Sequence, residues 1–291
     1  MSSLVLSVPG KSFLAGEYLA MKEGPCLLFA SKPRFELRAN KGHGKTEGIH
    51  PSSPAGKLIA AQSEFFKNYD LNFIDPHEGR GGWGASTAQF LTAFVLCEWR
   101  ESCELETLKA LSISRLLESY WQYAWDGTGF RPSGADLVAQ YKGSLTYFEK
   151  RAGMVSVYGW PFHDIDFALI PTGKKLATHE HLKTLGDFDE TKIAEAVATI
   201  RQGLQSGRSQ DFVAGVRANG EALEELNFVA PHTQVMLTSL RKTPGVLAAK
   251  GCGALGADVV FVVFEKSHEM PFANAVGPCD LSHGLEIQVK D

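Results

Sequence analysis

The spacing of apolar residues in the first half of the chain predicts a mixture of strands and helices. Apolar runs that are unbroken or alternate with polar residues are typical of strands. They occupy residues 3–8, 26–30, 34–39 and 138–148, and a short helical turn just before the last run is the alternative left open there. Apolar residues three or four positions apart are typical of helices. They occupy residues 55–69, 84–98 and 105–124. The first strand is expected to lead into a turn at Pro9-Gly10.

The pattern changes near residues 159–166. Beyond this point, strand-like runs occupy residues 167–170, 259–264 and 285–289. Helical patterns occupy residues 190–205, 210–226 and 231–243. Sets of strands and helices that do not alternate regularly favour an α+β architecture. We therefore predict two α+β domains, residues 1–162 and 163–291.

A glycine-rich run, Gly81-Gly82-Trp83-Gly84-Ala85-Ser86-Thr87-Ala88, stands directly before a predicted helix. Such a run presents backbone N–H groups at a helix N-terminus, where both the amides and the helix dipole favour an anion. Lys11 near the start of the chain adds a cation, and Asp136 in Pro132-Ser133-Gly134-Ala135-Asp136 adds a carboxylate. A phosphate cradle, a cation and a carboxylate are the parts of a phosphoryl-transfer site.

Two other motif matches are weaker. Gly79-x-Gly81-x-x-Gly84 fits the dinucleotide fingerprint, which also needs a preceding strand and an acidic residue about 20 positions later. Residues 75–78 have the composition of a loop, and the acidic residues at that distance lie in or just past a helix. An NAD enzyme is therefore a minor alternative. Gly10-Lys11-Ser12 resembles the end of a P-loop, but Val5 stands where the first glycine is required.

Composition narrows the class of protein. The chain has 291 residues, 44% of them hydrophobic, and a net charge of −4. A nucleic-acid-binding protein normally has a basic surplus, so we expect no nucleic-acid partner. Five cysteines without a CxxC motif argue against a disulfide framework and a zinc site. With neither a signal-like segment nor a long apolar run, we expect a cytoplasmic protein with no membrane contact. The expected oligomeric state is a monomer or a homodimer.

Three motifs in sequence resemble those of the GHMP kinase superfamily, which includes galactokinase, homoserine kinase, mevalonate kinase and phosphomevalonate kinase. The first is Pro9-Gly10-Lys11 with Gly16-Glu17-Tyr18, the second is the glycine-rich run, and the third is Lys250 with Gly253-Ala254-Leu255-Gly256-Ala257-Asp258. The segment from Pro132 to Asp136 is similar to the mevalonate and phosphomevalonate kinase branch. This resemblance implies a domain like the second domain of ribosomal protein S5, followed by a ferredoxin-like domain.

The resemblance also implies roles for individual residues. Asp136 and Lys11 are implied as catalytic residues, facing the acceptor oxygen and the transferred phosphoryl group. Contacts with ATP are implied for Gly81, Gly82, Gly84, Ala85, Ser86 and Thr87. Contacts with the acceptor, mevalonate or 5-phosphomevalonate, are implied for Lys11, Glu17, Tyr18, Arg131, Ser133, Gly134, Gly253 and Ala254. Magnesium is implied at Ser86 and at an acidic residue in place of the family's metal-binding glutamate. Asp126 is within about a residue of the expected spacing and is favoured, and Glu118, a few helical turns earlier, is the alternative.

Several residues depart from the family pattern. Trp83 replaces a usual leucine and Ala85 a usual serine, while Leu255 and Ala257 replace two glycines. The two β-carbons in the third motif are expected to narrow the approach of substrate. The resulting hypothesis is an ATP- and Mg²⁺-dependent kinase of the mevalonate pathway. The alternatives are an enzyme like diphosphomevalonate decarboxylase and an ATP-binding protein of this fold that lacks turnover.

Overall fold

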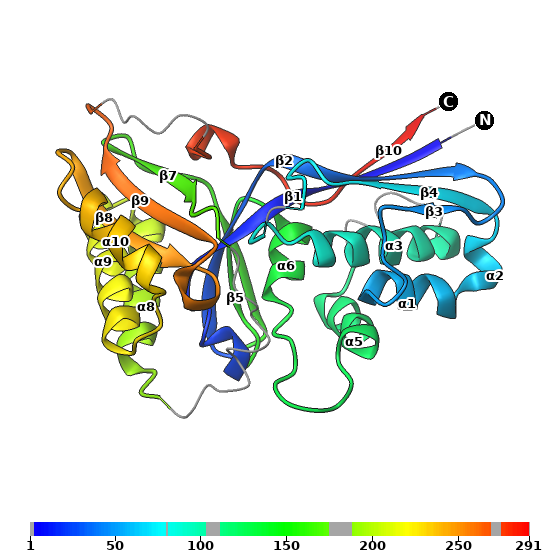
Figure 1. The fold of residues 1–291 in the computed structure, drawn as a ribbon, viewed down its shortest axis with the longest axis horizontal. Coiled ribbons are helices and arrows are strands. Elements are labelled where there is room, and N and C mark those ends of the chain that lie inside the picture. The colour runs from blue at the N-terminus through cyan, green and yellow to red at the C-terminus, as the bar shows by residue number, and fades with distance from the viewer. Residues whose placement is uncertain (1–2, 80, 103–110, 175–187, 269–274, 291) are drawn as a thin grey trace. The chain divides into compact units, whose positions relative to one another are not determined.

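The chain folds into two compact units, each built from separate segments. A computed structural model describes residues 3–79, 81–102, 111–174, 188–268 and 275–290 (Figure 1). The first unit comprises residues 1–11, 30–143 and 282–291, and the second comprises residues 12–29 and 144–281. The segments alternate because strands β1 (Ser3–Ala15) and β2 (Pro25–Lys41) each run from one unit into the other. A single boundary at residue 162 does not reproduce this division.

A mixed sheet organises the first unit, with the strand order β10–β1–β2–β4–β3. The strands besides β1 and β2 are β3 (Thr46–Glu47), β4 (Tyr69–Ile74) and β10 (Glu286–Lys290). β10 pairs antiparallel with β1 and places Val289 opposite Leu4. β4 pairs antiparallel with β2, whereas β3 runs parallel to β4. The strands predicted near residues 3–8 and 285–289 are confirmed, and the pairing explains how the end of the chain joins the first unit.

Arg34 fixes the segment that leads into β10. Its guanidinium donates to the hydroxyl of Ser282 at 2.6 Å and to the carbonyls of His283 and Gly284 at 2.7 Å each. It also donates to the hydroxyl of Ser7 at 2.6 Å. A guanidinium offers several N–H donors in a rigid plane, so one side chain can satisfy this whole turn.

Helices α1 (Pro54–Ala61), α2 (Ser63–Phe66), α3 (Ala85–Ser102), α5 (Ile113–Ala124) and α6 (Ala135–Lys142) belong to the same unit, and α3 packs against α1 and α6. The prediction of one helix over residues 55–69 is wrong. The Ser53 hydroxyl caps α1, Gln62 at φ −109° interrupts it, and Tyr69 already begins β4. The helix predicted over 105–124 can be assessed only from residue 111, and there it begins after the N-cap Ser112.

The strand predicted over residues 138–148 is wrong in its first half. α6 occupies this stretch until Gly143, whose φ of 83° ends the helix. The strand β5 (Leu145–Glu149) then follows and pairs antiparallel with β2 and with β6 (Met154–Tyr158). The buried run Leu137-Val138-Ala139 is compatible with either a strand or a helix, and the two flanking glycines decide between them.

In the second unit, a three-stranded antiparallel sheet has the order β7–β9–β8. Its strands are β7 (Ile165–Pro171), β8 (Val246–Cys252) and β9 (Val259–Glu265). The helices are α8 (Thr191–Ser206), α9 (Ser209–Glu225) and α10 (Pro231–Leu240); α8 packs on α9, while α9 and α10 pack on β8. These three helices and the strands β7 and β9 confirm the sequence prediction, whereas β4, β6 and β8 were not predicted.

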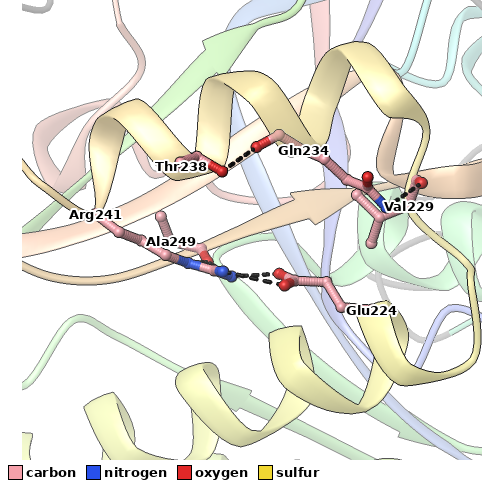
Figure 2. Close-up of polar contacts among 6 residues, drawn as sticks. All are labelled: Glu224, Val229, Gln234, Thr238, Arg241 and Ala249. Carbon is pink, nitrogen blue, oxygen red and sulfur yellow. Dashed lines mark hydrogen bonds and ion pairs between the residues drawn. The ribbon is translucent and has the colours of Figure 1, made fainter.

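Two arginines cover the outer edge of β8, which pairs only with β9 among the described strands. Arg217 on α9 donates to the carbonyl of Leu247 at 2.8 Å. Arg241 donates to the carbonyl of Ala249 at 2.9 Å, and Figure 2 shows these two residues together with Glu224. Glu224 accepts from Arg241 and holds it in place. Free carbonyls on a sheet edge are a template for pairing with another strand, so these contacts protect the edge.

Candidate active site

The glycine-rich run ends where α3 begins, as predicted. The N–H groups of Ala85, Ser86 and Thr87 fall in the first helical turn, where no intrahelical carbonyl can accept from them. Ser86 is exposed to solvent. Gly84 has φ +82°, and a β-carbon on it would lie 2.9 Å from Cε and Cγ of Lys11. Glycine is therefore required at residue 84, because the loop lies directly against the lysine side chain.

Trp83, where the family has leucine, belongs to the support beneath this loop. Its side chain is buried and stacks on His77 with ring centroids 4.8 Å apart and an interplanar angle of 7°. His77 in turn packs against Phe35 at 5.1 Å. The tryptophan thus fills the interior behind the glycine loop.

The turn predicted at Pro9-Gly10 is wrong, because β1 continues through these residues and includes Lys11. The strand continues to Ala15, and the N–H of Lys11 donates to the carbonyl of Trp83 at 3.0 Å. This bond fastens the first motif to the second. The lysine residue is only 8% exposed, so its ammonium is partly withdrawn from water.

Asp136 lies in the first turn of α6, where the helix dipole favours a negative charge. The helix begins after Gly134, which has φ +75°, and a β-carbon there would lie 2.2 Å from Cδ2 of Leu117. The hydroxyl of Ser133 accepts from the N–H of Ala135 at 3.2 Å. The Ser-Gly-x-Asp turn therefore fixes where the carboxylate points.

Lys11 and Asp136 form an ion pair, Nζ to Oδ2, of 2.8 Å. The other carboxylate oxygen, Oδ1, is buried and has no hydrogen-bond partner among the described residues. Burial, followed by the charge of Asp136, raises the pKa of the nearby Tyr120, which stays a neutral phenol. One carboxylate oxygen is held by the lysine while the other can accept a proton or a hydrogen bond.

The sequence pattern did not single out Gln140, which contacts two of the three segments that meet here and lies on the third. It is fully buried in α6, one turn after Asp136. Its amide is within hydrogen-bond distance of Pro9, Gly84 and Thr87. A glutamine inside an apolar helical run was the available signal, since buried polar side chains need partners.

Two residues that were predicted to belong to the site, Arg131 and Asp126, lie on the loop between α5 and α6. The Arg131 guanidinium lies 4.1 Å from the ring centroid of Trp121, a cation–π arrangement. Asp126 is exposed, and its Oδ1 accepts from the N–H and the hydroxyl of Thr128 at 2.9 and 2.7 Å. These hydrogen bonds lower the pKa of Asp126. Both of these hydrogen bonds come from Thr128, two residues along the same loop. The role of Asp126 as a metal ligand stays a prediction.

Within the second unit, Glu17 of the first motif and Lys250 of the third motif form a buried cluster. Lys250 is fully buried, and its Nζ donates to the carbonyl of Leu14 at 2.7 Å and to Oε1 of Glu17 at 3.1 Å. Burial lowers the pKa of Lys250, but Cys252 and Glu17 outweigh that effect and hold it above its usual value. Burial raises the pKa of Cys252 to about 11, so Cys252 is a neutral thiol near pH 7. Oε2 of Glu17 is buried without a hydrogen-bond partner among the described residues.

Tyr18 joins this cluster to the third motif. Its phenol oxygen accepts from the N–H of Leu255 at 3.0 Å, and its ring stacks on Phe228. Leu255 is held at φ +53°, a conformation that suits the glycine usual in the family. Ala257 has φ −90°, which any residue adopts. Of the two replaced glycines, only the first therefore stands in a conformation that favours glycine.

The described residues contain neither a helix able to span a membrane nor a group of three or more His, Cys, Asp or Glu side chains placed to hold a metal ion. Magnesium is usually bound by one or two carboxylates together with phosphates and water. Asp136, with a free oxygen, and Ser86, exposed beside the glycine loop, are oxygen donors of the kind that magnesium uses.

Searches by sequence found no matching protein-family model and no matching curated protein. Solved structures match over nearly the whole chain. The phosphomevalonate kinase of Streptococcus pneumoniae has 15% identity and a TM-score of 0.70, covering 92% of this chain and 93% of its own. The Methanococcus jannaschii mevalonate kinase has 13% identity and a TM-score of 0.67, covering 90% and 91%. The Lactococcus lactis galactokinase, complexed with galactose, has 13% identity and a TM-score of 0.72, covering 98% and 95%.

These neighbours are GHMP kinases, so the chain has the two-domain GHMP kinase fold and the predicted α+β class is confirmed. At identities of 13–15%, these matches show the fold and not the activity. Kinases named for different acceptors share this fold, so the fold does not identify the acceptor of this chain. The acceptor has to be inferred from the residues of the site.

Proposed function

We propose that the protein is an ATP-dependent small-molecule kinase that transfers the γ-phosphate of ATP to mevalonate or 5-phosphomevalonate. The observation that carries this proposal is the Lys11–Asp136 ion pair of 2.8 Å, formed where β1 meets the glycine loop at the start of α3. A similar structure, the Streptococcus pneumoniae phosphomevalonate kinase, has been solved with phosphomevalonate and AMPPNP. The proposal extends nucleotide use to this chain.

In this proposal the amides of Ala85, Ser86 and Thr87 hold the ATP phosphates. Asp136 orients the acceptor oxygen through Oδ1 and takes its proton when the acceptor is a hydroxyl. The acceptor oxygen bonds to the γ-phosphorus as the bond to the β–γ bridging oxygen breaks, and ADP leaves. Lys11 neutralises charge on the transferred group. Ser86 and Asp126 are the residues proposed to hold magnesium together with the phosphates, and the ion would supply further charge neutralisation. Positioning and electrostatics of this kind supply most of the acceleration in phosphoryl transfer.

Acceptor recognition is proposed for residues from both units. In the first unit these residues are Arg131 and the turn residues Ser133 and Gly134, which precede Asp136. In the second unit they are Glu17, which is paired with Lys250, Tyr18, which contacts Leu255, and Gly253 and Ala254 of the third motif. A cation such as Arg131 suits a carboxylate or a phosphate on the acceptor. This favours the acidic acceptors of the mevalonate pathway over a neutral sugar.

Release of ADP from Mg·ATP tests the proposal across mevalonate, 5-phosphomevalonate, 5-diphosphomevalonate, galactose and homoserine, with CO₂ followed in parallel. We expect ADP release that depends on one of the first two acceptors and no CO₂. Release of CO₂ with 5-diphosphomevalonate would identify a decarboxylase instead. ATP binding without turnover on any acceptor would identify a binding protein.

Asp136→Asn tests the catalytic assignment directly. A group that acts as a general base typically contributes about 10²–10⁴-fold, so we expect turnover to fall at least about 10²-fold. ATP affinity should change little, because Asp136 is assigned to the acceptor side. Turnover close to wild type in Asp136→Asn would remove it from the catalytic role.

A further inference from the structure

Gln140 joins the three chain segments that form the candidate site in the first unit. Its Nε2 donates to the carbonyl of Pro9 at 3.0 Å and to the carbonyl of Gly84 at 3.1 Å. Its Oε1 accepts from the hydroxyl of Thr87 at 2.7 Å. Pro9 precedes Lys11 by two residues, Gly84 and Thr87 flank the start of α3, and Gln140 itself lies on the helix of Asp136.

The chemistry of the partners fixes the orientation of this amide. Backbone carbonyls only accept hydrogen bonds, so the NH₂ group must face Pro9 and Gly84, which leaves Oε1 for Thr87. The Thr87 hydroxyl also lies 3.0 Å from the carbonyl of Gly84. It has one proton, which favours the shorter contact to Gln140. No other orientation of the side chain satisfies all three partners.

Packing around Gly84 shows how the amide acts on Lys11. A β-carbon on Gly84 would lie 2.9 Å from Cε and Cγ of Lys11 and 3.0 Å from Nε2 of Gln140. The lysine stem and the amide therefore both border the space that a side chain at residue 84 would fill. Gln140 also lies four residues after Asp136, on the same face of α6. A shift of the amide would move the glycine loop and Lys11 relative to the carboxylate.

We propose that Gln140 is a positioning residue of this site, which sets the distance from Lys11 and the glycine loop to Asp136. This inference rests on the proposed kinase function. Gln140 is completely buried, so it acts through the residues that it holds and does not touch substrate. The fold alone would need only an apolar side chain here, whereas the site needs three segments in fixed register.

Gln140→Met keeps the length of the side chain and removes its hydrogen bonds. Because displacement of a reacting group by about 1 Å can cost about 10²-fold, we expect kcat to fall about 10–100-fold with little change in the acceptor KM. Asn219→Leu is the matched control. Asn219 is the fully buried amide of α9, and neither of its polar atoms has a hydrogen-bond partner among the described residues. Its loss should leave kcat unchanged.

A milder pair of variants keeps the test valid if Gln140→Met does not fold. Thr87→Val removes one partner of the amide, whereas Thr87→Ser retains the hydroxyl. We expect a lower kcat in Thr87→Val than in Thr87→Ser, because only serine keeps the hydroxyl that donates to Gln140. Equal kcat in wild type, Gln140→Met and Thr87→Val would overturn the proposal, as would equal losses in Thr87→Val and Thr87→Ser.

Coupling to Lys11 separates positioning from a general structural effect. If Gln140 acts through Lys11, Gln140→Met should lower kcat much less in a Lys11→Met background than in wild type. Fully multiplicative losses would contradict the proposal. If the wild type shows no turnover on any acceptor, the proposed function is wrong, but the positioning role of Gln140 can still be tested. The stabilities of wild type, Gln140→Met, Lys11→Met and the double variant are then compared by urea unfolding. Non-additive changes in stability would support the positioning contact, and additive changes would refute it.

Discussion

The buried pair Lys250–Glu17 allows a prediction with a defined magnitude. Lys250 is completely buried, the Glu17 side chain is 6% exposed, and Nζ and Oε1 lie 3.1 Å apart. Removing one partner of a buried ion pair leaves an uncompensated charge and costs about 3–5 kcal/mol. Lys250→Met should therefore lower the free energy of unfolding by about this amount at pH 7. Lys250→Met with Glu17→Leu removes both charges and should recover most of the loss.

The pH dependence of the single variant provides an independent test. Without Lys250, Glu17 would be a buried carboxylate that lacks its cation, and burial disfavours the charged form of an unpaired carboxylate. An unfolded glutamate releases its proton above about pH 4.3. The unfolded state then binds fewer protons than the folded state, so stability falls by about 1.4 kcal/mol per pH unit as pH rises above that value. The deficit relative to wild type should therefore be small near pH 4 and large near pH 7.

Urea unfolding followed by circular dichroism between pH 4 and pH 8 measures both effects for wild type, Lys250→Met and the double variant. A deficit below about 1 kcal/mol in Lys250→Met at pH 7 would refute the assignment of a buried, charged pair. A deficit that does not change with pH would show that the loss comes from packing. A double variant as unstable as the single one would show that the contact with the Leu14 carbonyl dominates.

Three further predictions concern the second unit. Leu255→Gly should raise the thermal midpoint, because a left-handed conformation costs a non-glycine residue about 1–2 kcal/mol and glycine's greater unfolded-state entropy offsets part of this; a lower midpoint would show that the leucine side chain outweighs the strain. Iodoacetamide near pH 8 should label the exposed Cys279 and spare Cys252, whose pKa burial raises to about 11, and mass spectrometry of the labelled peptides would show the reverse if Cys252 were accessible. Arg217→Met combined with Arg241→Met should uncover the carbonyls of β8 and promote self-association, detected by light scattering after gel filtration, whereas an unchanged mass at high concentration would contradict protection of this edge.

The sequence predicted an element correctly where the residues of that element alone determine whether it is a helix or a strand. α8 and α9 were predicted within about two residues because their apolar positions recur at helical spacing and Gly207 separates them. α6 was missed because Leu137-Val138-Ala139 is buried on all sides, and a buried run has no amphipathic period. β1 was predicted to end at Pro9-Gly10, since both residues usually mark turns. Long-range pairing overrides that preference, as β1 continues to Ala15.

The residues of the candidate site also fall into those that a local sequence signal identified and those that it could not. The glycine-rich run and Asp136 were found because their chemistry is local: the backbone of one loop and the cap of one helix. Gln140 was missed because its partners at Pro9, Gly84 and Thr87 are distant in sequence, and nothing in residues 135–142 identifies them. The pairing of Lys250 with Glu17 was missed for the same reason, since 233 residues separate the two side chains.

The third motif shows which of its departures from the family pattern matter. A β-carbon on Gly253 would lie 2.7 Å from Oδ2 of Asp258, so this close approach needs a glycine, and the chain retains it. Ala257 stands in an ordinary right-handed conformation, and Leu255 is accommodated at positive φ with its N–H held by Tyr18. The substitutions thus fall where the loop tolerates a β-carbon, at the cost of strain at one residue. The motif therefore keeps its turn, while the expected narrowing of the substrate approach by its two β-carbons stays a prediction.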